Sequence, residues 1–172
     1  MIFYFVIQLS GGSYEKYVGL YKIKGRWYNI IDVLLSIASE TKKSCCAWVF
    51  SEKYVTENIR KLLHYNNEGG MFKLYTYPKG DDMIKYPYDG LFLLCYELEE
   101  HKIIFIYNEE KHRTHIIFKN VKDGKFDSIG FFSYGGRPKE IEASEIGVKT
   151  LEDLKQFKTL KEFHNFLLEV IE

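Results

Sequence analysis

The chain has 172 residues, of which 46% are apolar and 17% aromatic, and its 24 basic and 24 acidic side chains sum to a formal net charge of zero. This apolar content is enough to bury a core, which excludes a disordered tail. The balanced charge argues against a protein whose whole surface binds nucleic acid or anionic membrane, although a local basic patch fits within a neutral total. At this length we expect one domain covering residues 1–172.

Residues 1–9 are apolar and predict a first β-strand that is buried on both faces. The stretch lacks the charged start and the A-x-A site of a secretory signal, and it is too short to cross a bilayer. No other apolar run approaches membrane-spanning length, so we expect a cytoplasmic protein without membrane association.

Three cysteines are present, Cys45, Cys46 and Cys95, and an odd number excludes complete pairing within one chain. Adjacent residues on a strand point to opposite faces of a sheet. Free cysteine behaves as a small hydrophobic residue in a reducing compartment, so we expect buried, reduced thiols. The chain has no C-x-x-C or H-x-x-x-H spacing, and we predict no metal site and no cofactor.

The first half of the chain alternates between strand-like and helix-like patterns. After the first strand, the patterns predict a strand over residues 14–24, a helix capped by Asn29, a buried strand over 45–50, a second helix capped by Ser51 that ends near His64, and a strand over 71–77. These helices are expected to pack on the sheet that the strands form.

The second half contains four β-rich runs with short connections. The runs cover residues 91–98, 102–107, 114–121 and 126–132, and the connections cover 99–101, 108–113 and 122–125. The last connection contains Asp123-Gly124, a strong signal for a type I′ turn. Consecutive strands with short connections predict an antiparallel meander.

An acidic, irregular stretch over residues 140–145 is expected to follow the meander. Two short helical segments then end the chain, with Thr150 and Asp153 as one N-cap pair and Thr159 and Glu162 as another. The second segment has an apolar stripe at helical spacing, and we expect His164 on its outer side.

Together these elements predict an α+β fold. We expect a mostly antiparallel sheet with a four-stranded meander in the C-terminal half, packed by two central helices and short C-terminal helices. A meander that forms its own separate sheet is the alternative.

The charges are unevenly distributed along the chain. Residues 1–86 carry 12 basic and 8 acidic side chains, whereas residues 87–172 carry 12 basic and 16 acidic ones. The candidate acidic contacts for a basic partner are Glu97, Glu99, Glu100, Glu109 and Glu110.

Residues 73–88 interleave aromatic and basic side chains. The tyrosines are Tyr75, Tyr77, Tyr86 and Tyr88, and the lysines are Lys73, Lys79 and Lys85. This composition suits a protein contact, where tyrosine is enriched, or a single-stranded nucleic acid, whose bases stack on aromatic rings while lysines neutralise phosphate. It also suits tyrosines that only pack against the core.

No recognised catalytic motif is present. Gly80-Asp81-Asp82 resembles a solvated turn more than a metal-binding aspartate pair. His112, Arg113 and His115 are candidate nucleic-acid contacts, but two histidines three positions apart face opposite sides of a strand. Arg26, Trp27 and Arg137 are further possible contact residues. No phosphate-loop or hydrolase-elbow motif occurs, so we predict no catalytic residues.

Three functional hypotheses follow. The first is a non-catalytic cytosolic protein that recognises and occludes a protein partner, such as an immunity protein, antitoxin or inhibitor of bacterial or phage origin acting on a basic toxin or nuclease. The second is a protein that binds nucleotides or single-stranded nucleic acid, with or without phosphodiester cleavage. The third is a viral structural or assembly protein. The oligomeric state does not follow from the sequence.

Overall fold

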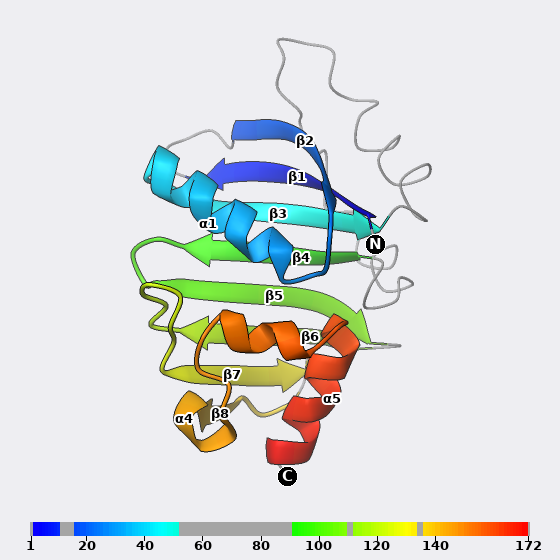
Figure 1. Ribbon diagram of the computed structural model, residues 1–172, viewed down its shortest axis with the longest axis vertical. Helices are drawn as coiled ribbons and strands as arrows, with labels where there is room; N and C mark the ends of the chain where they lie inside the picture. Colours follow the sequence, from blue (N-terminus) through cyan, green and yellow to red (C-terminus); the bar gives the residue numbers. More distant parts are fainter. Residues whose placement is uncertain (1, 11–15, 52–90, 110–111, 134–135, 172) are drawn as a thin grey trace.

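The computed structural model describes residues 2–10, 16–51, 91–109, 112–133 and 136–171. Its strands are β1 (Ile2–Ser10), β2 (Lys16–Lys24), β3 (Ser44–Ser51), β4 (Leu91–Glu97), β5 (Lys102–Glu109), β6 (His112–Lys119), β7 (Ser128–Ser133) and β8 (Lys139–Glu142). They form one eight-stranded sheet in the order β2-β1-β3-β4-β5-β6-β7-β8 (Figure 1).

Every pair of neighbouring strands in this sheet is antiparallel. From β3 to β8 each strand pairs with the one before it, so the meander is confirmed and belongs to the same sheet as the N-terminal strands. The alternative of a separate sheet is therefore wrong. The one departure from sequential order is β1, which lies between β2 and β3, so that the chain crosses β1 through the helix α1 (Asn29–Thr41).

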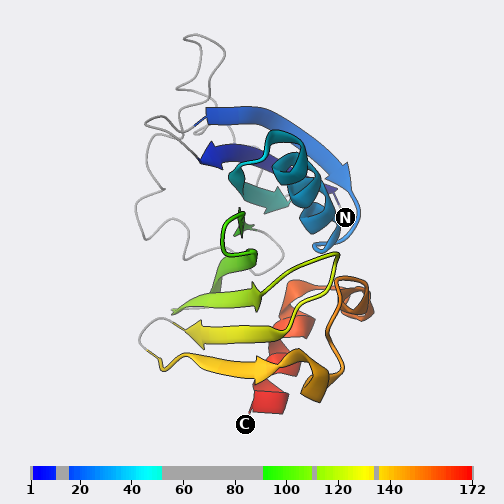
Figure 2. The ribbon, with the colours of Figure 1, turned by 90° about the vertical axis from the view of Figure 1, so that its left-hand side faces the viewer.

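The other helical elements are α4 (Ala143–Ile146), the 3₁₀ helix η3 (Glu152–Gln156) and α5 (Leu160–Ile171). Figure 2 shows α1 and α5 on the same side of the curved sheet, with α1 over its N-terminal half and α5 over its C-terminal half. The α+β prediction is confirmed. The predicted second central helix lies outside the described residues, apart from Ser51, which is the last residue of β3.

The predicted cap of α1 is wrong in its detail, because Asn29 is the first residue of the helix and Tyr28 occupies the N-cap position. The Asn29 side chain instead turns back, and its Oδ1 accepts a hydrogen bond from the backbone N–H of Arg26 at 2.6 Å. A Cβ atom on Gly25 would lie 2.6 Å from that oxygen, so this turn requires glycine. The helix ends at Lys42, the C-cap residue, which adopts a left-handed conformation.

The Asp123-Gly124 turn is confirmed, since both residues have positive φ, at 53° and 74°. It closes a short loop in which Lys122 and Lys125 exchange backbone hydrogen bonds of 2.8 and 3.0 Å. The turn lies within the β6–β7 connection rather than joining the two strands directly, because β6 ends at Lys119 and β7 begins at Ser128. The predicted connection over residues 108–113 is too long, since β5 and β6 extend into it.

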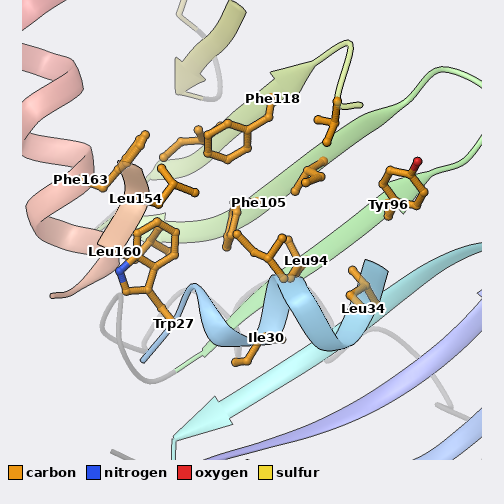
Figure 3. Close-up of a cluster of buried hydrophobic side chains, with 14 of the residues drawn as sticks. Trp27, Ile30, Leu34, Leu94, Tyr96, Phe105, Phe118, Leu154, Leu160 and Phe163 are labelled. Carbon is orange, nitrogen blue, oxygen red and sulfur yellow. The ribbon is translucent and has the colours of Figure 1, made fainter. Parts of the chain in front are cut away.

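The core lies between the sheet and the helices (Figure 3). Trp27, which lies two residues before α1, makes edge-to-face ring contacts with Phe105 of β5 and Phe163 of α5, with centroids 5.5 and 5.8 Å apart. Its indole N–H donates a hydrogen bond to the buried carbonyl of Phe157 at 3.0 Å. Trp27 is only 2% exposed, so it is a core residue that joins the two ends of the chain and not the contact residue considered above.

The C-terminal part contains more regular structure than the sequence predicts, because residues 140–145 belong to β8 and α4. The Thr150–Asp153 cap is confirmed: Thr150 Oγ1 accepts from the N–H of Asp153 at 3.2 Å, and the Asp153 carboxylate accepts from the N–H of Thr150 at 3.1 Å. At the start of α5, Thr159 Oγ1 accepts from the N–H of Glu162 at 3.1 Å.

Candidate functional site: the open face of the sheet

The face of the sheet opposite α1 and α5 carries an apolar surface. Strand side chains alternate between faces, and the row Leu94, Phe105, Ile116 and Phe131 is buried on the helix side. The neighbouring positions form what we call the open face: Cys46, Leu93, Cys95, Ile104, Ile106, His115, Ile117 and Phe132. All but Leu93, which is 7% exposed, are half-buried, and no described helix lies over this face.

The open face is aromatic at its β6–β7 side. His115 and Phe132 are register partners, and their rings stack with centroids 4.6 Å apart and planes inclined by 14°. Burial, together with the positive charge of Arg113, lowers the pKa of His115 below its ordinary value of 6.5. The imidazole is therefore neutral at pH 7, and it acts as an aromatic surface rather than as a cation.

One border of the open face is charged. Glu97 and Lys102 are register partners at the β4–β5 turn, where Lys102 also forms an ion pair with Glu100 that lowers the pKa of that carboxyl group. Further along the border, the Lys119 ammonium group contacts Glu140 at 2.9 Å. The apolar surface is thus flanked by ionised side chains, as in the polar rim of an interface.

The cysteines are divided between the two faces. Cys46 and Cys95 are register partners on β3 and β4, and they form a disulfide with a Cα–Cα distance of 4.0 Å. The prediction of three reduced thiols is therefore wrong for this pair. Cys45 lies on the helix side, where its Sγ lies 3.5 Å from the carbonyl oxygen of Leu34 and burial raises the pKa of its thiol to about 11.

His164 lies on the inner side of α5, contrary to the prediction of an outer position. It is 1% exposed and packs against the rings of Tyr107 and Phe131, with centroids 5.6 and 5.2 Å away. Thr114, the register partner of Tyr107, is fully buried nearby in the sheet. His164 shares its helical face with Leu160 and Leu167, which are four and three residues away, and this spacing could have indicated its burial.

An open groove of about 660 Å³ lies beside β7 and β8. Its charged lining is mixed, with Lys125 and Lys149 facing the same space as Asp127, Glu140 and Glu142. No group of three or more potential metal ligands occurs within the described ranges. The groove is therefore a polar surface feature without the converging like charges of an ion site.

The structure places the predicted acidic contacts at two ends of the sheet. Glu97, Glu99 and Glu100 lie together at the β4–β5 turn, whereas Glu109 lies at the far end of β5, roughly 24 Å away along eight residues of strand. Glu110 lies outside the described residues. Of the four described glutamates, Glu97, Glu99 and Glu100 are available to a single small contact, whereas Glu109 lies apart from them.

The residues of the predicted tyrosine–lysine stretch lie outside the described residues: Lys73, Tyr75, Tyr77, Lys79, Lys85, Tyr86 and Tyr88. The same holds for Gly80-Asp81-Asp82. Of the basic candidates on β6, His112 pairs with Glu109 at the strand end, while Arg113 and His115 lie two residues apart and share one face of the strand.

The open face is the feature that the sequence did not reveal as a site. The sequence feature that could have indicated this surface is the nearly continuous apolar run of β5. In this run Ile104 and Ile106 alternate with the core residues Ile103, Phe105 and Tyr107. An antiparallel strand with one solvated face normally alternates apolar and polar residues. A run without that alternation indicates that both faces are used.

No protein-family model, no curated protein and no solved structure matches the chain. Among the described helices, none combines the length and apolar character that a bilayer-spanning helix requires.

Proposed function

We propose that this is a non-catalytic cytoplasmic protein that recognises a basic protein partner and occludes its functional surface, in the manner of an immunity protein, antitoxin or inhibitor. The observation that carries the proposal is the open face, an apolar and aromatic surface over which no described helix lies. Monomeric proteins seldom expose a contiguous apolar patch of several hundred Å² unless it binds something.

The dimensions of the open face support a protein partner. The eight residues of the open face form two rows across five strands, so they span about 13 Å of strand length and, at about 4.8 Å per strand, roughly 300 Å². A stable interface buries about 800 Å² on each side. The face supplies the apolar centre of such an interface, and the turns at the strand ends supply the rest. The side chains are also of the kinds that dominate binding energy, with a stacked aromatic pair and Arg113 at its edge.

The charge beside the open face supports a basic partner. Glu97, Glu99 and Glu100 outnumber Lys102 at the β4–β5 turn, which gives this border a net charge of −2. The Lys102 ion pair keeps Glu100 ionised, and Glu99 is exposed. An acidic border accelerates association with a positively charged surface and disfavours acidic competitors. The apolar centre then supplies the affinity.

One observation favours the alternative of nucleic-acid binding. Arg113 and the stacked pair of His115 and Phe132 lie at the same corner of the open face, where an arginine and aromatic rings could contact phosphate and bases. Fluorescence titration with single-stranded oligonucleotides at two salt concentrations tests this function. Salt-sensitive binding supports it, and flat titrations contradict it.

The proposed function is tested by capture from extract of the source cells, followed by purification of the captured protein and measurement of its activity. Three baits are compared: the wild-type chain, Ile117→Glu on the open face, and Leu168→Glu on α5, where Leu168 is an exposed apolar residue. Circular dichroism confirms that each bait is folded.

The proposal predicts that the wild type and Leu168→Glu retain the same basic protein and inhibit its activity, whereas Ile117→Glu does neither. Equal retention by Ile117→Glu contradicts the role of the open face. A captured protein that keeps full activity in the complex contradicts occlusion, and the absence of any captured protein contradicts the proposed function as a whole.

A further inference from the structure

The Cys46–Cys95 disulfide lies at a structurally important place in the sheet. It joins β3 to β4, the two strands at the junction between the half that contains α1 and the half that contains α5. Along the chain these two cysteines are separated by 49 residues. The disulfide is therefore a direct covalent link between two strands that are held together otherwise by their hydrogen-bonded pairing and by the packing of the core.

The sheet allows one pairing among the three cysteines. Cys46 and Cys95 face each other across the strand pair on the open face, whereas Cys45 points into the core on the other side. The backbone of β3 separates Cys45 from the disulfide, and its raised pKa keeps it in the unreactive thiol form. While the sheet is folded, Cys45 can therefore neither form a disulfide with Cys46 or Cys95 nor undergo thiol–disulfide exchange with the bond between them.

The two cysteines of the disulfide are more exposed than Cys45. Cys46 and Cys95 are half-buried on the face that no described helix covers, whereas Cys45 is 1% exposed. The strand pair that holds the disulfide has six registered positions, from Cys45 opposite Tyr96 to Phe50 opposite Leu91. This ladder keeps the two sulfur atoms opposed after reduction, so the same bond can form again.

We propose that Cys46 and Cys95 form a reversible redox site that responds to a low-molecular-weight thiol–disulfide couple and controls how firmly the two halves of the sheet are joined. In reduction, a small thiolate attacks one sulfur to give a mixed disulfide and one cysteine thiolate. A second small thiolate then displaces the other cysteine, which releases the small disulfide and, after protonation, leaves two cysteine thiols. Two electrons and two protons reach the protein, and oxidation is the reverse.

The site suits a cytoplasmic protein, since the disulfides of that compartment are mostly transient and serve catalysis or redox sensing. The loss of the link is expected to raise hydrogen exchange in β3 and β4 while the fold persists. The α5-covered strands β6 and β7 are expected to change less, because their register does not depend on the disulfide.

The test equilibrates the full native chain with glutathione and glutathione disulfide at a series of ratios, followed by acid quench, denaturation and alkylation. Mass spectrometry counts the labelled cysteines, and peptide mapping identifies the linked pair. We expect the count to rise from one to three as the glutathione fraction increases, and to return to one on reoxidation. Only the Cys46–Cys95 link should be found, and the Cys45→Ser variant should show the same transition.

Three results would overturn the proposal. The first is three labelled cysteines at every ratio, which means that no disulfide forms. The second is a link that includes Cys45. The third is a link that glutathione opens only after denaturation, which makes the disulfide a permanent structural bond. Reduction should lower the thermal midpoint of the wild type but not that of Cys95→Ser, which has no disulfide to lose. This comparison distinguishes opening of the disulfide from a general effect of glutathione on the protein.

Discussion

The Trp27→Phe substitution tests whether one buried indole joins the two ends of the chain. In the native protein Trp27 is 2% exposed, and its N–H donates to the carbonyl of Phe157, 130 residues away in sequence. Phenylalanine keeps an aromatic ring in the same place but has no donor. The substitution therefore removes the hydrogen bond and part of the packing without placing a charge or a polar group in the core.

The expected loss of stability is the sum of two effects. The buried carbonyl of Phe157 loses its partner, which costs about 1–2 kcal/mol. The smaller ring leaves space beside Phe105 and Phe163, which costs about 1–2 kcal/mol more. The free energy of unfolding should therefore fall by about 3 kcal/mol. A domain of ordinary stability, about 5–15 kcal/mol, remains folded after this loss.

Urea unfolding followed by far-ultraviolet circular dichroism measures the effect. With a slope of about 2 kcal/mol/M, the midpoint should fall by about 1.5 M. The matched control is Arg26→Ala, since Arg26 is exposed and adjacent in sequence, and its effect should stay within about 0.5 kcal/mol. If Trp27→Phe also changes the free energy of unfolding by less than about 0.5 kcal/mol, the buried Trp27 indole does not join the two ends of the chain.

Three further predictions concern other parts of the fold. Burial lowers the pKa of His115, so as the pH falls the unfolded state takes up a proton before the folded state does. The free energy of unfolding should therefore fall as the pH drops below about 6.5. In urea titrations at a series of pH values, His115→Phe should remove the part of this pH dependence that comes from His115. Hydrogen bonds from the backbone N–H groups of Lys149 and Thr150 lower the pKa of Asp153, so this carboxylate stabilises the fold above its ordinary pKa of 3.8 and stops doing so in acid. Asp153→Ala should therefore lower the free energy of unfolding by about 1 kcal/mol at pH 7, and by progressively less as the pH falls. Cys95→Ser should lower stability by about 4 kcal/mol in an oxidising buffer, as expected for a link that spans 49 residues, and should lose its difference from the wild type in a reducing buffer.

The sequence was most informative where structure depends on neighbouring residues. The meander follows from apolar runs with short connections, and the Asp123-Gly124 turn follows from the positive φ that both residues tolerate. The Thr150–Asp153 cap is equally local, because its partners are three residues apart. Such features depend on spacing that is visible in the chain itself.

Features that depend on distant pairing could not be predicted in the same way. The register that opposes Cys46 to Cys95 arises between strands connected by a long stretch of chain, and no local pattern fixes it. The open face likewise requires knowledge of which side of the sheet α1 and α5 cover. The burial of His164 is compatible with its helical spacing but not with the usual exposure of a polar side chain, and it depends on the rings of Tyr107 and Phe131 that pack around it.

The central claim is that the open face binds a protein partner, and calorimetric titration of the purified partner tests it most directly. Phe132, which stacks on His115 in the open face, is replaced by alanine, and Leu168→Ala on α5 serves as the control. The account predicts that Phe132→Ala weakens binding about 30-fold, equivalent to about 2 kcal/mol, while Leu168→Ala leaves the Kd unchanged. An unchanged Kd for Phe132→Ala would contradict it.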